Sequence, residues 1–256
     1  MEHNLDPQQI AASFSKAAPD YNKWAEPHLR IAQNLLSFLP ERADTILELG
    51  CGTGILTKLL CSKYPLAKIT AIDIAPGMVE QCKERCQHKN LSVTVAAAEE
   101  FRLPNNADLI VSSSSFHWFY DKAAVAKNIQ KSLAPHGRFA VAMSVKGFFQ
   151  ELYTLYKSIT GEPLALLWDD ADCRNVFSDL NLPMERAFTD SFQMEAADPW
   201  HALRSINKIG AAPRGLSHPL SLGELKQLAL TYANQYKTKN GVKVTYNIFY
   251  GITGAL

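Results

Sequence analysis

The sequence of 256 residues lacks any apolar run that approaches the roughly 20 residues a membrane-spanning helix needs. Its start, MEHNLDPQQI, has neither the basic nor the apolar region of a signal peptide. An excess of one charge is missing too, because 26 Lys and Arg offset 25 Asp and Glu. Proteins that bind nucleic acid generically carry a basic field over much of their surface. We therefore expect a cytoplasmic protein with no membrane or nucleic-acid partner.

Cysteine is scarce as well, with five residues that form neither a paired disulfide framework nor two CxxC units. Cys82 and Cys86 lie one helical turn apart, a spacing at which two thiolates can share a metal ion. No second pair and no nearby histidine cluster accompanies them in the sequence. We interpret them as ordinary helix residues, and we expect reduced thiols and no metal site.

Short apolar runs alternate with amphipathic stretches between Asp44 and Met143, which is the pattern of a parallel sheet covered by helices. Strands are predicted at Thr45–Leu49, Lys68–Ile72, Leu91–Ala96, Asp108–Ser112 and Gly137–Met143. Helices are predicted at Ile55–Lys63, Gly77–Gln87 and Lys122–Leu133. A proline and a glycine just after the last helix favour a turn there. The pattern predicts an α/β fold with a doubly wound sheet.

Further elements are expected on both sides of this core, residues 44–144. Residues 1–43 predict a helical segment, interrupted near Pro19 and Pro27. Residues 145–256 predict helices at Phe148–Thr160, Cys173–Leu182, Pro199–Ile209 and Leu222–Tyr236, and extended segments at Phe188–Met194 and Val242–Tyr250. No repeat or low-complexity linker separates these segments, so we expect a single domain over residues 1–256.

Three alternating glycines follow the first predicted strand directly and precede a helix. Gly50, Gly52 and Gly54 let the chain turn sharply and let backbone N–H groups approach a ligand that a Cβ atom would exclude. At the carboxyl end of a central strand, such a turn lines the crevice where open α/β sheets bind ligands. The motif therefore predicts a nucleotide-like ligand.

Two acidic residues distinguish between ligands for this turn. Asp73 closes the second strand about twenty residues after the glycines, where its carboxylate can accept hydrogen bonds from ribose hydroxyls. Glu48 lies two residues before the first glycine. An added carboxylate repels a pyrophosphate but attracts the sulfonium and amino groups of S-adenosylmethionine. The charge, and a GxGxG rather than GxGxxG spacing, favour the methyl donor over a dinucleotide.

The segments ELGCGTG, AIDIAPGM and LAPHGRF resemble the class I S-adenosylmethionine-dependent methyltransferases over roughly the first 145 residues. The resemblance implies a Rossmann-like, mostly parallel seven-stranded sheet with added helices that form a lid. It places the amino-terminal segment over the cofactor and the segments after residue 144 on the substrate side. The cofactor residues that it implies are Glu48, Gly50, Cys51, Gly52, Gly54, Asp73, Ile74, Met78, Ala98, Glu99 and Ser113.

Within this set, the family's pattern assigns the methionine part to Glu48 and the glycines, the ribose to Asp73 and the adenine to Ile74 and Met78. The chain departs from the family after the third core strand, where an acid commonly receives the adenine amino group. Ala97 occupies that position here. Either Ala98 or Glu99 supplies the contact differently, or Glu99 and Glu100 are solvated charges.

Four further segments resemble the malonyl-acyl carrier protein O-methyltransferases of biotin synthesis. They are Phe14–Tyr21, Ser113–Trp118, Leu203–Ala211 and Val244–Gly251. His117 departs from the glutamine that often precedes the tryptophan in this family. The resemblance implies methyl transfer from S-adenosylmethionine to the free carboxylate of malonyl-acyl carrier protein, or of malonyl-coenzyme A. The product is the malonyl methyl ester that primes biotin (pimeloyl) synthesis.

A malonyl carboxylate is ionised at neutral pH, so it can attack the methyl carbon without a general base. We expect Arg204 to orient it, because a guanidinium can hold one carboxylate oxygen. Tyr21, His117 and Trp118 are the other candidate catalytic residues. Tyr21 lies in the segment over the cofactor, and His117 and Trp118 directly follow a strand's carboxyl end.

The last part of the chain is basic, with Lys208, Arg214, Lys237, Lys239 and Lys243 after an acidic stretch. It provides either a docking surface for an acidic carrier protein or a solubilising face. Two other functions stay open: methylation of a small free acid of the aconitate type, and a noncatalytic S-adenosylmethionine-binding module.

Overall fold

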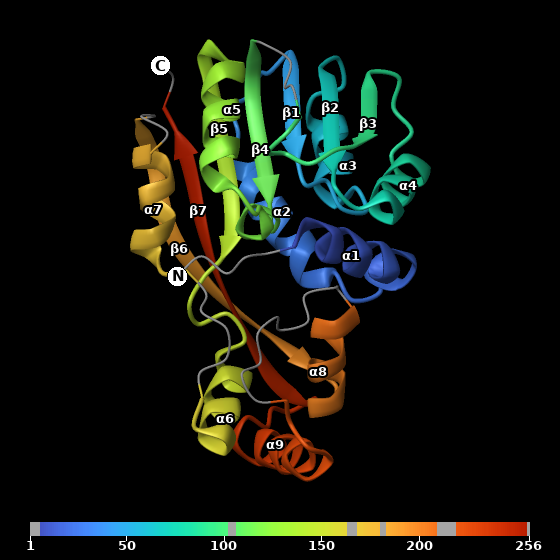
Figure 1. Cartoon of the computed structure of the whole chain (residues 1–256), viewed down its shortest axis with the longest axis vertical. Coiled ribbons are helices and arrows are strands. Elements are labelled where there is room, and N and C mark those ends of the chain that lie inside the picture. Colours follow the sequence, from blue (N-terminus) through green and yellow to red (C-terminus); the bar gives the residue numbers. More distant parts are fainter. Residues whose placement is uncertain (1–5, 102–105, 163–167, 180–182, 209–218, 255–256) are drawn as a thin grey trace.

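The computed structural model describes residues 6–101, 106–162, 168–179, 183–208 and 219–254. Seven strands form one sheet in the order β3-β2-β1-β4-β5-β7-β6 (Figure 1). The strands are β1 Thr45–Leu49, β2 Lys68–Asp73, β3 Leu91–Val95, β4 Ala107–Ser113, β5 Leu133–Ser144, β6 Met184–Ala196 and β7 Val242–Thr253. The first five are parallel, and β7 pairs antiparallel with both β5 and β6. The predicted α/β fold with a mostly parallel seven-stranded sheet is confirmed.

The helices flank the sheet and extend beyond it. They are α1 Pro7–Tyr21, α2 Glu26–Phe38, α3 Ile55–Lys63, α4 Pro76–Arg85, the short 3₁₀ helix η1 Phe116–Trp118, α5 Lys122–Ser132, α6 Gln150–Thr160, α7 Asp170–Asp179, α8 Pro199–Lys208 and α9 Leu222–Gln235. Within the described ranges, none of them has both the length and the apolar character to cross a bilayer.

Side chains that alternate along the strands divide the core between two faces of the sheet. On β1, Ile46 joins a cluster with residues of α2 and α3, whereas Leu47 and Leu49 join a cluster with residues of α5 and α7. Because successive side chains of a strand point to opposite faces, Glu48 lies on the same face as Ile46. This places its carboxyl group against α3.

The long β6–β7 ribbon runs past the lower edge of the parallel strands and carries a second layer of helices. Figure 1 shows α6, α8 and α9 around this ribbon, below the carboxyl ends of β1, β2 and β4. Helix α1 lies between these two parts, across the strand ends. Segments before and after the parallel core therefore meet where the sheet's binding crevice is expected.

Some element boundaries differ from the prediction. Strand β5 begins at Leu133 rather than Gly137, since Leu133 already pairs with Ala107 before a register shift in the ladder. Strand β6 is longer than Phe188–Met194, because β7 supplies hydrogen-bonding partners from Val242 to Thr253. Helix α7 begins at Asp170 instead of Cys173. The predicted helix ends at Leu182 and Ile209 lie outside the described residues.

Candidate active site

The glycine turn after β1 is anchored to the end of β2. The backbone N–H groups of Gly50 and Cys51 both donate to the carbonyl oxygen of Ile72, at 2.8 and 2.9 Å. Gly50, Gly52 and Gly54 have φ values of 75°, 53° and 87°, in the left-handed region that L side chains rarely adopt. The turn therefore requires all three glycines for its backbone conformation.

The three glycines differ in what surrounds them. A Cβ atom on Gly50 would lie 2.4 Å from the Cβ of Ser115, and one on Gly54 would lie 2.6 Å from the Sγ of Cys86. A Cβ atom on Gly52 would meet nothing within 4 Å. Gly50 and Gly54 thus allow close packing, whereas Gly52 leaves space open on the ligand side of the turn.

A cavity of about 910 Å³ opens at the carboxyl ends of the central strands, between the glycine turn, α1 and α2. It brings together most of the residues predicted for the site: Tyr21, Glu48, Gly50, Cys51, Gly52, Asp73, Ile74, Met78, Ala98, Glu99, Ser113 and Trp118. Gly54, His117 and Arg204 do not line it. Several other residues line the cavity that were not predicted as site residues, including Ile10, Phe14, His28 and Thr53.

Asp73 holds the turn and faces the cavity at the same time. Its Oδ2 accepts the N–H of Gly52 and its Oδ1 accepts the N–H of Ala75, both at 2.9 Å. Burial raises the pKa of the Asp73 carboxyl, and these two backbone hydrogen bonds oppose the rise. Each carboxylate oxygen has a second lone pair, so Asp73 has the capacity to accept from two adjacent hydroxyls of a ribose.

Glu48 is buried, with 1% of its surface exposed. Thr57 on α3 donates its hydroxyl hydrogen to Oε2 of Glu48 at 2.6 Å. Burial raises the pKa of Glu48 to about 8, although the Thr57 hydrogen bond lowers it. A buried carboxyl group in this state gains from a cationic ligand beside it, because the cation favours the ionised form.

Three thiols pack behind the glycine turn. Cys51, Cys82 and Cys86 form a small cluster with Ala71, and the Sγ of Cys86 lies 3.3 Å from the carbonyl oxygen of Gly54. All five cysteines of the chain are free thiols, as predicted. In the part of the chain that the structure describes, no group of three or more His, Cys, Asp or Glu side chains is arranged to hold a metal ion.

Helix α1 forms the wall of the cavity that comes from the amino-terminal segment, through Ile10, Phe14 and Tyr21. Two hydrogen bonds hold its carboxyl-terminal half to the core. Ser15 accepts the N–H of Gly77 at 3.2 Å, and Asn22, just after the helix, accepts the hydroxyl of Thr53 at 2.9 Å. Burial, assisted by Asp73, raises the pKa of Tyr21, so its phenol stays protonated.

The 3₁₀ turn after β4 brings Trp118 to the cavity, with His117 next to it. Trp118 lines the cavity and contacts Phe14 edge-to-face, with ring centroids 5.3 Å apart. His117 lies beside it, at a centroid distance of 5.5 Å, but it does not line the cavity itself. On α2, the unpredicted His28 does line the cavity and lies 5.6 Å from the ring of Tyr21.

The loop after β3 brings Ala98 and Glu99, but not Ala97, to the cavity. Oε1 of Glu99 accepts the backbone N–H of Tyr120 at 2.8 Å, and burial raises the pKa of this carboxyl. Glu100 is exposed and accepts the hydroxyl of Tyr120 at 3.0 Å. Which group receives the adenine amino group stays a prediction, with Glu99 now partly buried at the cavity wall.

Arg204 lies on the surface of α8. Its side chain is exposed, and its Nε donates to the carbonyl oxygen of Trp200 at 3.2 Å. Its role as the carboxylate partner stays a prediction. Of the basic residues near the end of the chain, Lys208 lies 3.7 Å from Asp20 and Lys243 lies 3.5 Å from the buried Glu151. Arg214 lies outside the described residues.

Comparisons with known proteins agree with this geometry. Residues 46–137 match a family model described as a methyltransferase domain. YcgJ protein from Bacillus subtilis has the same fold, with a TM-score of 0.58 at 16% identity over 88% of this chain and 97% of that one. Geranyl diphosphate C-methyltransferase from Streptomyces coelicolor, solved with S-adenosyl-L-homocysteine, gives a TM-score of 0.54 at 11% identity over 88% and 78%. The fold and the cavity define a class I S-adenosylmethionine-dependent methyltransferase.

Relatives that align over nearly the full length identify the family within this class. Malonyl-[acyl-carrier protein] O-methyltransferase of Priestia megaterium is 30% identical, over 97% of this chain and 98% of that protein. The protein of the same name from Geobacter sulfurreducens is 29% identical over the same shares. The chain belongs to the malonyl-[acyl-carrier protein] O-methyltransferase family, which confirms the resemblance read from the sequence.

Proposed function

We propose that the protein transfers the methyl group of S-adenosylmethionine to the free carboxylate of malonyl-acyl carrier protein. The product would be the malonyl methyl ester that primes biotin (pimeloyl) synthesis. The observation that carries this proposal is the similarity to relatives of that name over 97% of the chain. The aligned region includes the substrate-side residues 145–256 as well as the cofactor core. The free state of all five thiols suits a reducing compartment, and we place the reaction in the cytoplasm.

The residues around the glycine turn fit the cofactor. Asp73 offers two oxygens to the ribose, Ile74 and Met78 offer apolar contacts to the adenine, and Glu48 offers a carboxylate to the cationic methionine part. Gly52 leaves the approach open, because a side chain would fill that space. Bound S-adenosylmethionine supplies an electrophilic methyl group on a sulfonium centre.

The protein contributes to this reaction by orienting the acceptor carboxylate and by excluding water. A carboxylate needs no base, and holding it in line with the methyl carbon and sulfur contributes up to about 7–11 kcal/mol in favourable cases. Phe14 and Trp118, packed edge-to-face, and Tyr21 provide an aromatic wall that keeps this space dry. In a dry cavity the attraction between the anion and the methyl donor is stronger than in water.

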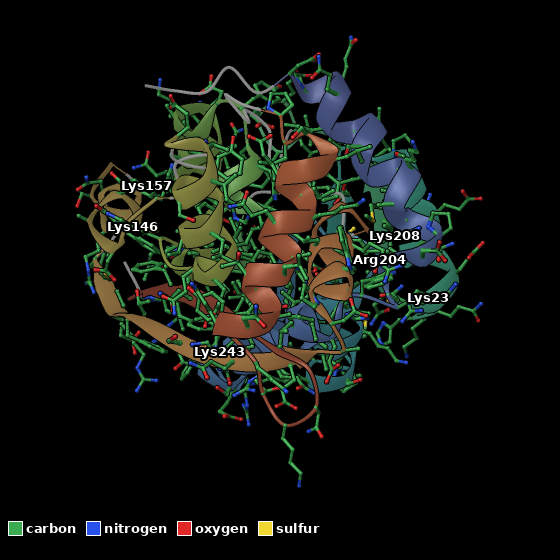
Figure 2. The ribbon with its side chains drawn as sticks, turned by 90° about the horizontal axis from the view of Figure 1, so that it is seen from below. Lys23, Lys146, Lys157, Arg204, Lys208 and Lys243 are labelled. Carbon is green, nitrogen blue, oxygen red and sulfur yellow. The ribbon has the colours of Figure 1, made fainter. Side chains whose placement is uncertain are left out.

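A basic surface on α8 provides a docking site for an acidic carrier protein. Trp200, Arg204 and Lys208 are spaced by four residues, so they lie along one side of α8, and we call them the α8 stripe. Trp200 is 41% exposed, and exposed aromatic and arginine side chains are typical of protein interfaces. Figure 2 shows Arg204 and Lys208 next to each other with Lys23 nearby, while Lys146, Lys157 and Lys243 lie apart from them in this view.

The α8 stripe adjoins the helix that lines the cavity. Lys208 of the stripe and Lys23, just after α1, both approach Asp20 near the end of α1, at 3.7 and 2.6 Å. The ring of Trp24 lies against His201 of α8 in a tilted arrangement, at a centroid distance of 4.7 Å. A carrier protein on this surface would therefore bind next to a wall of the cavity, from which its flexible arm can enter.

A comparison of acceptors tests the proposed function. The purified protein is given S-adenosylmethionine with malonyl-carrier protein, malonyl-coenzyme A, malonyl-pantetheine or free acids such as malonate and aconitate, and kcat/KM is measured. We expect the highest kcat/KM with malonyl-carrier protein. Activity on free acids alone would assign the chain to small-acid methylation, and S-adenosylhomocysteine binding without any turnover would favour a noncatalytic module.

A further inference from the structure

Two histidines and a serine that line the cavity or lie next to it have polar atoms that the proposed cofactor contacts do not use. The Nδ1 atoms of His28 and His117 and the hydroxyl of Ser114 are buried and, among the residues that the structure describes, have no hydrogen-bond partner. His28 and Ser114 line the cavity, and His117 lies between Ser114 and the lining residue Trp118 in the chain. Buried polar groups without partners are unfavourable, so two that line the cavity and a third next to the lining residue Trp118 indicate a polar ligand.

The backbone at Ser114 supports a functional role for this corner of the cavity. Ser114 has a φ of 56°, a left-handed conformation that is uncommon for a residue other than glycine, asparagine or aspartate. Its N–H donates to the carbonyl oxygen of Ala142 at 2.8 Å, which holds it in this conformation. Backbone strain of this kind concentrates at ligand-binding sites, where it aims a side chain.

Both imidazoles are neutral. Burial lowers the pKa of His28 to about 4, and burial, Lys122 and His28 lower the pKa of His117 to about 3. A neutral imidazole has one N–H group, so each ring is able to donate one hydrogen bond without carrying a positive charge.

Neutral donors suit the acceptor of this reaction better than a buried cation does. The carboxylate begins as an anion, and its charge decreases as the new bond forms. A full positive charge beside it would stabilise the starting anion more than the transition state. Neutral N–H and O–H groups also orient the anion, but they stabilise it less relative to the transition state and so raise the activation barrier less. They bind the less basic ester product more weakly than the anion.

We propose that His28, His117 and Ser114 form a subsite for the acceptor carboxylate and hold the oxygen that does not react. This inference rests on the proposed function. The other oxygen forms a bond to the methyl carbon while the carbon–sulfur bond breaks and its electron pair stays on sulfur. No proton is transferred, so both histidines stay neutral throughout the reaction.

Leucine and glutamine substitutions test the subsite. His28→Leu and His117→Leu remove the N–H groups but keep most of the bulk, and we expect each to raise the KM for malonyl-pantetheine by about tenfold. The affinity for S-adenosylhomocysteine, measured by calorimetry, stays within about twofold of the wild type. His28→Gln and His117→Gln retain a donor, and we expect them to recover most of the lost kcat/KM.

His201→Leu is the matched control. The Nδ1 of His201 is also buried and, within the described residues, has no partner, but this ring lies against Trp24 at a tilt. None of the described residues of α8 lines the cavity, whereas His117 lies in the chain between the lining residues Ser115 and Trp118. We expect its KM for malonyl-pantetheine to match that of the wild type. An equal rise in KM for all three leucine variants would show a general effect of removing a buried imidazole, and it would overturn the subsite.

A spectroscopic measurement separates binding from turnover. The side-chain nitrogen resonances of the histidines are recorded in the protein saturated with S-adenosylhomocysteine, before and after addition of malonyl-pantetheine. We expect the resonances of His28 and His117 to shift and that of His201 to stay in place. Wild-type turnover with unshifted resonances and unchanged leucine variants would overturn the subsite alone. A wild type inactive on every malonyl acceptor would overturn the proposed function.

Discussion

Asp73 and Asp108 perform the same backbone task at opposite ends of the sheet. Asp73 accepts the N–H groups of Gly52 and Ala75 beside the cavity, and Oδ2 of Asp108 accepts those of Asp44 and Thr45 at the start of β1, at 2.9 and 2.8 Å. Substitution of each aspartate removes backbone hydrogen bonds, but only substitution of Asp73 also removes a proposed ligand contact. Comparing the two variants therefore distinguishes the effect on stability from the effect on binding.

We expect Asp73→Asn to weaken S-adenosylhomocysteine binding roughly ten- to hundredfold, since a hydrogen bond to a charged group contributes about 1.5–3 kcal/mol. Asp108→Asn should lower the melting temperature and leave the affinity unchanged. Calorimetric titration and thermal unfolding of both variants check this prediction. Equal affinities for the two variants would remove Asp73 from the ligand site.

Glu48 makes cofactor binding depend on pH. In the ligand-free protein its pKa is about 8, above the ordinary value of 4.5, so it is mostly protonated at neutral pH. A cationic ligand group favours the ionised form, so binding releases a proton, and affinity for S-adenosylhomocysteine should rise between about pH 6 and pH 8. Titrations in buffers of different ionisation enthalpy measure the released proton. Glu48→Gln should abolish both the release and the pH dependence.

The same shift affects the stability of the ligand-free protein. The folded-state pKa of Glu48 lies above its unfolded value, so its contribution to stability is complete below about pH 4.5 and is lost as the pH rises through about 8. His28 and His117 have the opposite sign. Their folded-state pKa values, about 4 and about 3, lie below the ordinary 6.5, so their contribution is lost as the pH falls from 6.5 through these values.

Among the secondary-structure elements, the glycine turn connects β1 to α3, packs against the end of α4 and forms part of the cavity. Gly54→Ala would place its Cβ 2.6 Å from Cys86 Sγ and 3.0 Å from Cys82 Sγ, both on or next to α4. We expect overpacking to cost about 1–3 kcal/mol, in addition to about 1–2 kcal/mol for the left-handed conformation. Gly52→Ala meets nothing within 4 Å and should incur only the conformational cost.

The two alanine variants should therefore separate stability from binding. We expect Gly54→Ala to lower the melting temperature more, and Gly52→Ala to lose more affinity for S-adenosylhomocysteine, because its methyl group would occupy the approach of the ligand. Thermal unfolding and calorimetric titration of the pair provide the measurement. A Gly52→Ala variant with wild-type affinity would show that the ligand does not approach this part of the turn.

The elements of the parallel core were predictable because buried strands are continuous apolar runs bounded by turn residues. Strand β1 and helix α3 occupy the predicted residues, and Asp73 lies at the end of β2 as predicted. The length of β6 was not predictable, since six of its 13 residues are polar and exposed and only pairing with β7 makes them a strand. Local sequence patterns contain no information about a partner strand that lies far away in the chain, as β7 does.

The site was predictable where a motif marks it and not where packing forms it. Glu48, Asp73 and Gly52 lie in a recognisable order along the chain, and the cavity contains all three. A lone histidine on an amphipathic helix belongs to no recognisable motif, so His28 was not predicted as a site residue. For Arg204 the sequence identified a helix but not its outward direction, which depends on how α8 packs against α1 and β6.

At the scale of the whole molecule, the α8 stripe predicts a dependence of activity on salt and on charge reversal. We expect Lys208→Glu to raise the KM for malonyl-carrier protein roughly tenfold and to leave the KM for malonyl-pantetheine unchanged, because only the former docks. Lys157→Glu makes the same charge change on α6, away from the stripe in Figure 2, and should affect neither. Added salt should raise the KM for the carrier protein alone.

Arg204→Ala distinguishes the two roles considered for this residue. As part of the docking stripe, Arg204 should affect only the reaction with malonyl-carrier protein. As the partner of the reacting carboxylate, it should affect malonyl-pantetheine equally. Its exposed position and its hydrogen bond to the carbonyl of Trp200 support the docking role. Steady-state kinetics with both acceptors decide between them.

Methyl transfer to a carboxylate oxygen determines where the transferred methyl group is found in the product, and isotope labelling locates it. The protein is incubated with malonyl-carrier protein and S-adenosylmethionine labelled with carbon-13 at the methyl group, and the product is analysed by NMR and by mass spectrometry of the released arm. We predict one labelled methyl group, on oxygen, as the ester of the terminal malonyl carboxyl. Label on a carbon, nitrogen or sulfur atom, or unlabelled carrier protein from an enzyme that binds the cofactor, would rule out methylation of the malonyl carboxylate.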